Sequence, residues 1–133
     1  MVVDDHSVNR FLLRLVLERS WPHCTVCEAE DGQKAVQALQ EMHHDLVFMD
    51  MVMPHMDGIE ATQALRASQD PRVARTPVIG LTANVNQQDL ARFESSGLNV
   101  LMLKPFEPEK LCEQIEQLVY AQATTLRTDT AQA

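Results

Sequence analysis

Side chains that can bind metal and phosphate directly follow four of the five short apolar runs in this sequence. Asp4 and Asp5 follow the first run, Asp50 the third, Thr82 the fourth and Lys104 the fifth. Three carboxylates, a hydroxyl and an ammonium in one crevice would bind a hard divalent cation together with a phosphoryl group. Mg²⁺ fits best, because it favours a few carboxylates combined with waters and phosphate oxygens.

Each of these residues, taken alone, has an ordinary structural interpretation. A single Asp after a strand is most often a turn former or a helix cap, and a single Thr or Lys there is a cap or a solvated charge. Capping does not explain five such residues at the same end of four strands. The crowding of Asp4, Asp5 and Asp50 also predicts a raised pKa for at least one of them, because neighbouring like charges disfavour joint ionisation.

The elements that must position these residues are visible as apolar runs and helical periods. The runs predict strands buried on both faces, at residues 1–3, 25–27, 46–49, 77–81 and 100–103. Five segments with helical period alternate with them, which predicts a doubly wound α/β fold with a parallel sheet. In such a sheet the ligand site lies beyond the carboxyl ends of the strands, where the five polar residues would meet.

Local signals indicate where the expected helices begin and end. Ser7 is expected to cap the first helix and Asn86 the fourth, while Asp57 with Glu60 resembles a capping box at the start of the third. Gly97 is expected to end the fourth helix. One face of the first helix carries apolar side chains, which is typical of an amphipathic helix: Val8, Phe11, Leu12, Leu15 and Val16.

Length and composition limit the class of protein. The chain has 133 residues, 45% of them hydrophobic, which indicates one domain. A formal charge of −8 argues against a nucleic-acid surface, and no apolar run approaches the roughly 20 residues needed to cross a bilayer. Three cysteines are too few for a disulfide framework, so we expect reduced thiols and a cytoplasmic protein.

We expect residues 1–121 to form the domain and residues 122–133, which are polar and rich in Thr, to form a tail or linker. Only three residues precede Asp4, whereas a central strand should be about five residues long. The sequence is therefore expected to be an excerpt of a longer one.

Two other patterns are interpreted as having no chemical role. Cys24 and Cys27 have a C-x-x-C spacing, but residues three apart on a strand point to opposite faces, which disfavours joint chelation. His6 and His55 lie close to the predicted crevice, yet solvated loop histidines are the ordinary case. We expect neither histidine to influence the chemistry.

The chain resembles the receiver domains of response regulators and hybrid histidine kinases from Val2 to about Tyr120. The resemblance rests on four motifs in a specific order and spacing: Val2-Val3-Asp4-Asp5, Met49-Asp50-Met51-Val52-Met53-Pro54 followed by Met56-Asp57-Gly58, Leu81-Thr82-Ala83, and Lys104-Pro105-Phe106. It implies a flavodoxin-like five-stranded sheet of order 2-1-3-4-5 with five helices. It also implies that the domain catalyses its own phosphorylation and dephosphorylation.

The resemblance assigns a role to each residue of the crevice. Asp5 and Asp50 would ligate Mg²⁺ directly, Asp4 would act mostly through water, and the backbone carbonyl of Val52 would add another oxygen. Asp50 would take the phosphoryl group from a phosphohistidine.

Two further residues would act on the phosphoryl group itself. Lys104 would supply positive charge to its oxygens, and Thr82 would donate a hydroxyl hydrogen bond to it. The resemblance also implies a cis peptide bond between Lys104 and Pro105. The partner would be a histidine kinase domain or a histidine phosphotransfer domain, with no contact to nucleic acid or membrane.

One position departs from the pattern of many family members, which carry Tyr, Phe or His three residues before the lysine of strand five. This chain has Leu101 there. The aromatic half of the coupled switch is therefore absent. We expect phosphorylation to act on the loop after Thr82 more than on the fifth strand.

The sequence is compatible with several kinds of parent protein, the longer protein to which this domain would belong. The phrase from Asp4 to Arg10, with the phrase from Thr76 to Asn84, looks most like receivers fused to hybrid sensor kinases, whose membrane anchor would tether the domain. A free-standing response regulator and a pseudo-receiver that only binds protein are the alternatives. A phosphatase of the haloacid dehalogenase type needs a second Asp where this chain has Val52.

Overall fold

The five strands form one parallel sheet in this computed structural model, which describes residues 1–53, 56–83, 87–104 and 107–119. Its order is β2-β1-β3-β4-β5, as predicted. The strands are β1 (Val2–Val3), β2 (Glu28–Ala29), β3 (Val47–Asp50), β4 (Val78–Thr82) and β5 (Val100–Leu103). Within the described ranges, no helix combines the length and apolar character needed to cross a bilayer.

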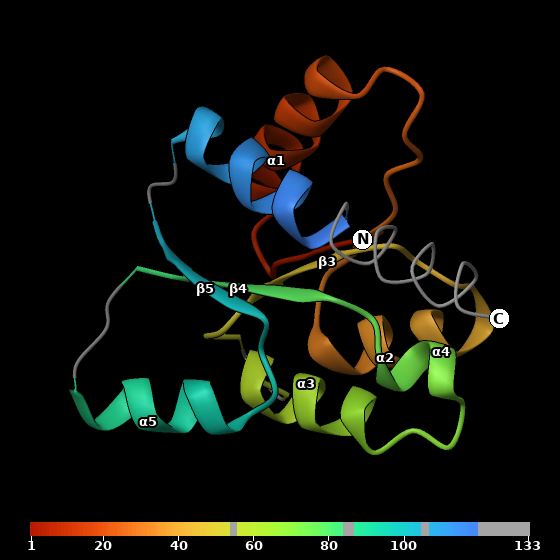
Figure 1. The fold of residues 1–133 in the computed structure, drawn as a ribbon, viewed down its shortest axis with the longest axis vertical. Coiled ribbons are helices and arrows are strands. Elements are labelled where there is room, and N and C mark those ends of the chain that lie inside the picture. The colour runs from red at the N-terminus through yellow and green to blue at the C-terminus, as the bar shows by residue number, and fades with distance from the viewer. Residues whose placement is uncertain (54–55, 84–86, 105–106, 120–133) are drawn as a thin grey trace, which may run out of the picture.

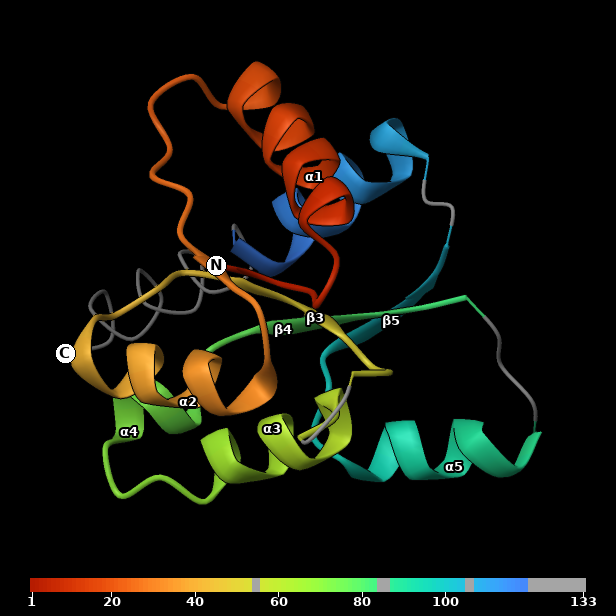
Figure 2. The ribbon, with the colours of Figure 1, turned by 180° about the vertical axis from the view of Figure 1, so that it is seen from behind.

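Helices cover both faces of the sheet, which confirms the doubly wound α/β prediction (Figure 1). Figures 1 and 2 show α1 and the helix at residues 108–119 on one face, with α2, α3 and α5 on the other. The bounds are α1 (Ser7–Ser20), α2 (Gly32–Glu41), α3 (Gly58–Arg66), α4 (Pro71–Ala74) and α5 (Gln87–Ser95). The short helix α4 was not predicted, because four residues are too few to show a helical period.

Alternate residues of each strand point into two separate cores. Val3, Met49 and Val78 lie in the core that packs against α2 and α3, whereas Phe48 and Ile79 lie in the core on the α1 side. This alternation follows from the pleat of a strand and explains why the central strands read as continuous apolar runs.

Two details of the sequence analysis are wrong. Helix α1 begins at Ser7 with His6 at the N-cap, so Ser7 does not cap it. The second strand lies at Glu28–Ala29 and not at residues 25–27, because β1 pairs Val2 with Glu28. The cap of α3 is confirmed, since the Asp57 side chain accepts a hydrogen bond of 2.9 Å from the Glu60 backbone N–H. Gly97 follows the end of α5 with a φ of 100°, and Asn86 lies outside the described residues.

The buried face of α1 also differs from the one that the apolar pattern indicates. Leu13 and Leu17 are buried, whereas Val8, Phe11 and Leu12 are 66%, 58% and 53% exposed. Helix α1 therefore has an apolar face toward the sheet and a second apolar face toward solvent.

The Arg66 side chain joins the end of α3 to the segments that lead into β4 and β5. Its guanidinium donates to the carbonyl oxygens of Gly97 (3.0 Å), Ala74 (3.0 Å) and Thr76 (2.7 Å), and to Asn99 Oδ1 (3.0 Å). Burial lowers the pKa of Arg66, which indicates that the charge is partly removed from water. The fork of donors thus satisfies four acceptors that would otherwise need water.

We expect Arg66→Met to lower the free energy of unfolding by about 3 kcal/mol, because hydrogen bonds to charged groups contribute about 1.5 to 3 kcal/mol each and do not add fully. Arg66→Lys should lose most of the same amount, since an ammonium lacks the planar fork. Urea denaturation of the metal-free protein measures both. Arg72→Met is the matched control, because the Arg72 side chain is 78% exposed and its one polar contact within the described ranges is a 3.7 Å ion pair with Asp70. Equal losses for Arg66→Met and Arg72→Met would contradict this prediction.

Candidate functional site

The carboxylates of Asp4 and Asp50 lie at the carboxyl ends of two neighbouring strands. Val3 of β1 pairs with Met49 of β3. Asp4 follows Val3 and Asp50 follows Met49, so both aspartates lie at the same edge of the sheet. Both are buried, with 4% and 5% of their surface exposed. Asp5 follows directly and is partly exposed. The structure therefore brings together the three acidic residues that the sequence singled out.

Lys104 reaches this acidic cluster from β5. Its Nζ lies 3.2 Å from Asp4 Oδ2 and 3.5 Å from Asp50 Oδ1. Its backbone N–H donates to the carbonyl oxygen of Thr82, the last residue of β4, at 2.7 Å. Thr82 is buried at the same edge of the sheet. One ammonium therefore lies beside two buried carboxylates, with a hydroxyl-bearing residue on the adjacent strand end.

The turn after β3 holds the Asp50 side chain. Asp50 Oδ1 accepts a hydrogen bond of 3.2 Å from the Val52 backbone N–H. The start of α3 packs tightly behind this turn, because a Cβ on Gly58 would lie 2.6 Å from the Asp50 carbonyl oxygen and 2.7 Å from Met51 Cα. Only glycine allows this approach, so the Asp-Gly pair at residues 57–58 serves both as cap and as close contact.

The pKa of Asp50 is raised, mainly because burial disfavours the ionised carboxylate. The Val52 N–H and the Lys104 charge lower it, while the charges of Asp4 and Asp5 raise it further. The direction agrees with the sequence prediction. The main cause does not, because removal from water outweighs the repulsion between carboxylates that the prediction relied on.

Arg10 is a positioning residue that the sequence analysis missed. Its Nη1 donates to the Asp4 backbone carbonyl at 2.7 Å, and its Nε donates to Glu28 Oε1 at 3.1 Å. The side chain therefore ties the start of α1 to the end of β1 and to β2. The sequence signal that could have indicated this role is the position of Arg10 in the first turn of α1, shortly after Asp4 and Asp5.

Asp5 supplies a buried oxygen to the acidic cluster, and His6 Nδ1 lies 3.1 Å from it. Asp5 Oδ1 is buried and has no hydrogen-bond partner in the part of the chain that the structure describes. Ligand atoms of Asp4, Asp5 and His6 all lie within 4.8 Å of one another, the only such group found among the described residues. A buried carboxylate oxygen that accepts no hydrogen bond and lies beside a second carboxylate fits a hard divalent cation.

Several predicted residues cannot be placed at this site or lie away from it. His55, Pro105 and the Lys104–Pro105 bond lie outside the described residues. Cys24 and Cys27 are free thiols. Leu101 pairs with Gly80 and packs against the core on the α3 side. It also lines a groove of about 470 Å³ between α5 and β5, together with Phe93 and Leu103.

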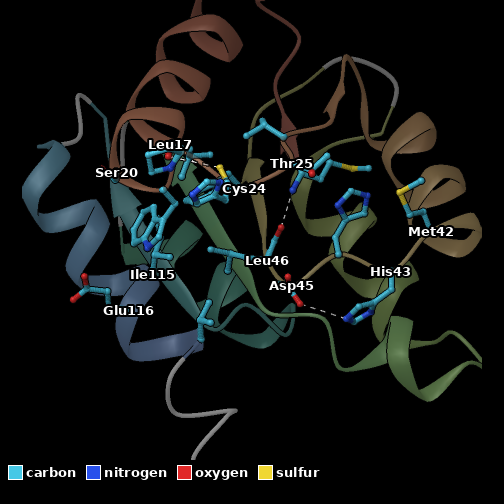
Figure 3. A pocket seen from close by; sticks show the side chains of 18 residues that line it. Leu17, Ser20, Cys24, Thr25, Met42, His43, Asp45, Leu46, Ile115 and Glu116 are labelled. Carbon is cyan, nitrogen blue, oxygen red and sulfur yellow. Dashed lines mark hydrogen bonds and ion pairs between the residues drawn. The ribbon is translucent and has the colours of Figure 1, made fainter.

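A larger cavity of about 700 Å³ lies at the other end of the sheet (Figure 3). It is lined by the end of α1, the residues before β3 and the helix at residues 108–119, with Leu17, Leu46 and Ile115 among them. Its side-chain ion pair is one of 3.7 Å between exposed His43 and Asp45, and the Met1 amino group and Cys24 Sγ donate to the backbone carbonyls of Leu46 and Leu17. The carboxyl ends of the strands, with their carboxylates and Lys104, are therefore the better candidate site.

Comparison with known proteins identifies relatives over most of the chain. The response regulator receiver domain family matches residues 1–116. The sensor protein EvgS of Escherichia coli is 35% identical over 118 residues, which cover 89% of this chain and 9% of EvgS. Transcription factor SKN7 of Saccharomyces cerevisiae is 35% identical over 111 residues, which cover 84% of this chain and 17% of SKN7. The chain therefore spans less than a fifth of these relatives.

A solved structure is similar in fold and in sequence. The receiver domain of sensor histidine kinase PA1611 from Pseudomonas aeruginosa, described with a magnesium ion coordinated in the active site cleft, has a TM-score of 0.79 and 31% identity. The comparison covers 89% of this chain and 93% of that one. Together with the family match over residues 1–116, this likeness shows that the chain belongs to the response regulator receiver domains, the phosphoacceptor domains of two-component systems.

Proposed function

We propose that Asp50 is the residue that takes the phosphoryl group. The observation that carries this assignment is the position of a buried carboxylate at the end of the central strand β3, 3.5 Å from the Lys104 ammonium and beside Asp4 and Asp5. The Val52 N–H and Lys104 both approach Oδ1, so we assign the attack to Oδ2. A bond forms between Oδ2 and phosphorus while the bond from phosphorus to the donor nitrogen breaks, and its electron pair stays on that nitrogen.

Receiver domains of this family bind Mg²⁺ in the active site. In this chain Asp5 and Asp50 would hold the ion directly, Asp4 would act through water, and the Val52 carbonyl would add an oxygen. When bound, the ion neutralises the carboxylates and the oxygens of the transferring phosphoryl group. The buried Asp5 Oδ1 supports this assignment, because it accepts no hydrogen bond among the described residues.

Lys104 and Thr82 would act on the phosphoryl oxygens. The Lys104 ammonium lies 3.2 Å from Asp4 Oδ2 and 3.5 Å from Asp50 Oδ1, so it would lie close to the oxygens of a phosphoryl group on Asp50. Thr82 would donate its hydroxyl from the end of β4. Both residues are placed by the sheet itself, so little reorganisation is needed when charge develops.

Receiver domains interact with histidine kinases or phosphotransfer domains. We propose that a phosphohistidine of such a domain is the donor, and that the parent protein is a hybrid sensor histidine kinase acting in the cytoplasm. The exposed apolar side chains of Val8, Phe11 and Leu12 support docking of the donor, because α1 begins two residues after Asp5. A free-standing response regulator and a protein-binding pseudo-receiver are the alternatives.

Incubation with Mg²⁺ and acetyl phosphate tests the assignment and excludes the pseudo-receiver. We expect the intact mass to increase by one phosphoryl group. Borohydride reduction of the acyl phosphate should then convert Asp50, and no other acidic residue, to homoserine. Asp50→Asn should abolish the labelling, whereas Asp45→Asn should not, because Asp45 is 89% exposed at the other end of the sheet. Unchanged labelling of Asp50→Asn would overturn the proposal.

A further inference from the structure

The His6 side chain lies against the acidic cluster, contrary to the expectation from the sequence. Its Nδ1 is 3.1 Å from Asp5 Oδ1 and 3.5 Å from Asp4 Oδ1. Asp4 Oδ1 accepts the His6 backbone N–H at 2.9 Å, and Asp4 Oδ2 lies 3.2 Å from Lys104 Nζ. Asp5 Oδ1 has no hydrogen-bond partner among the described residues. The imidazole nitrogen therefore lies beside a buried carboxylate oxygen of the site that accepts no hydrogen bond.

The backbone explains why the imidazole stays in this position. His6 is the N-cap of α1, in extended conformation, and its side chain makes no capping hydrogen bond. The Asp4 carboxylate accepts the His6 backbone N–H, which fixes the turn that leads into α1. The imidazole is thus held at the mouth of the crevice without taking part in the helix, and its side chain is 70% exposed.

The spacing of these atoms suits two ligands of one small cation. Two ligands at right angles, each about 2.1 Å from an ion, are about 3 Å apart. The Nδ1 to Asp5 Oδ1 distance of 3.1 Å matches that edge. Imidazole nitrogen is a good ligand for first-row transition ions, whereas Mg²⁺ prefers oxygen.

We propose that Nδ1 of His6 is an additional ligand, next to Asp5, of the cation site at Asp4, Asp5 and Asp50, and that it makes the site prefer first-row transition ions over Mg²⁺. This inference rests on the proposed function, because it uses the same cation site. The phosphoryl chemistry of Asp50 is unchanged. The inference concerns only which cation the site prefers when it supports this chemistry.

Calorimetric titration of the protein with Co²⁺ and, separately, with Mg²⁺ tests the inference without any activity assay. His6→Ala should weaken Co²⁺ binding about tenfold or more, as expected for loss of a metal-site partner, and leave the Mg²⁺ dissociation constant almost unchanged. His43→Ala is the matched control, because His43 also pairs with an aspartate, at 3.7 Å from Asp45, away from the cluster. Asp5→Asn should weaken the binding of both ions.

The ratio of the two dissociation constants separates the inference from its alternatives. If His6 only forms an ion pair with Asp5, its removal should change the affinity for both ions by the same factor, and the inference is wrong. Equal loss of Co²⁺ affinity in His6→Ala and His43→Ala would show adventitious binding at surface histidines and would also overturn it. If the unsubstituted protein binds Mg²⁺ but His6→Ala leaves the ratio of the Co²⁺ and Mg²⁺ dissociation constants unchanged, the inference is wrong and the proposed function stands. If neither ion binds, both are wrong.

Discussion

Replacing Lys104 by Met should lower the rate of phosphorylation by acetyl phosphate in saturating Mg²⁺ about a hundredfold. The Lys104 ammonium lies 3.5 Å from Asp50 Oδ1, so it is placed to stabilise charge that develops on the phosphoryl oxygens. Loss of one preorganised group of this kind costs about 10²- to 10³-fold in rate. The initial rate of phosphoprotein formation, followed by intact mass, measures the effect.

Cation binding separates this catalytic loss from damage to the metal site. Lys104→Met removes a positive charge next to Asp4 and Asp50, so it should leave Mg²⁺ binding unchanged or tighter. Lys110→Met is the matched control, because the Lys110 side chain is 68% exposed and its one ion pair in the described part of the chain is a 3.5 Å contact with Glu107. A rate for Lys104→Met within a few fold of the Lys110→Met rate would remove Lys104 from the phosphoryl chemistry.

The meeting of the polar residues was predictable from the sequence because parallel register leaves little freedom. Val3 is paired with Met49, and Thr82 is paired with Leu103. Any residue that ends or directly follows one of these strands must therefore lie at the same edge of the sheet. The identity of the five residues then indicated the chemistry, even though each of them alone resembles a cap or a surface charge.

The features that were not predictable depend on packing. Helix α1 carries two apolar faces, and periodicity does not decide whether Leu13 or Phe11 is buried; contact with the sheet does. The proximity of His6 to Asp5 depends on the extended N-cap conformation, which residue type does not specify. Burial of Asp50 dominates its pKa for the same reason, because removal from water is a property of the folded chain.

In the absence of metal, Asp50→Asn should be more stable at neutral pH than the unsubstituted protein, called the parent below. In the unsubstituted protein, burial and the neighbouring charges of Asp4 and Asp5 disfavour ionisation of the Asp50 carboxylate and raise its pKa. The amide of Asn carries no charge, and Lys104 retains Asp4 as its partner at 3.2 Å. The free energy of unfolding, from urea denaturation with chelator present, should therefore be higher for the variant.

Mg²⁺ should reverse this order of stability. A ligand that binds only the folded state, supplied at 100 times its dissociation constant, adds about 2.7 kcal/mol to the free energy of unfolding. The parent should gain this amount, whereas Asp50→Asn should gain much less at the same concentration, because it lacks one of the proposed ligands. An unmoved denaturation midpoint of the parent in Mg²⁺ would show that the acidic cluster is not a cation site.

The pH dependence of the metal-free protein provides an independent check on Asp50. The pKa of Asp50 in the folded state lies above the ordinary value of 3.8. Between pH 3.8 and the folded-state pKa, the folded state therefore binds more protons than the unfolded state. The Asp50 contribution to stability is therefore complete below pH 3.8 and is lost as pH rises through the folded pKa. Other carboxylates also make the stability depend on pH. The Asp50→Asn variant retains these carboxylates, so their contributions cancel when the two proteins are compared. The stability of the parent minus that of the variant should thus decrease as pH rises through this window and then level off, and a difference that increases would show that the folded pKa of Asp50 is not raised.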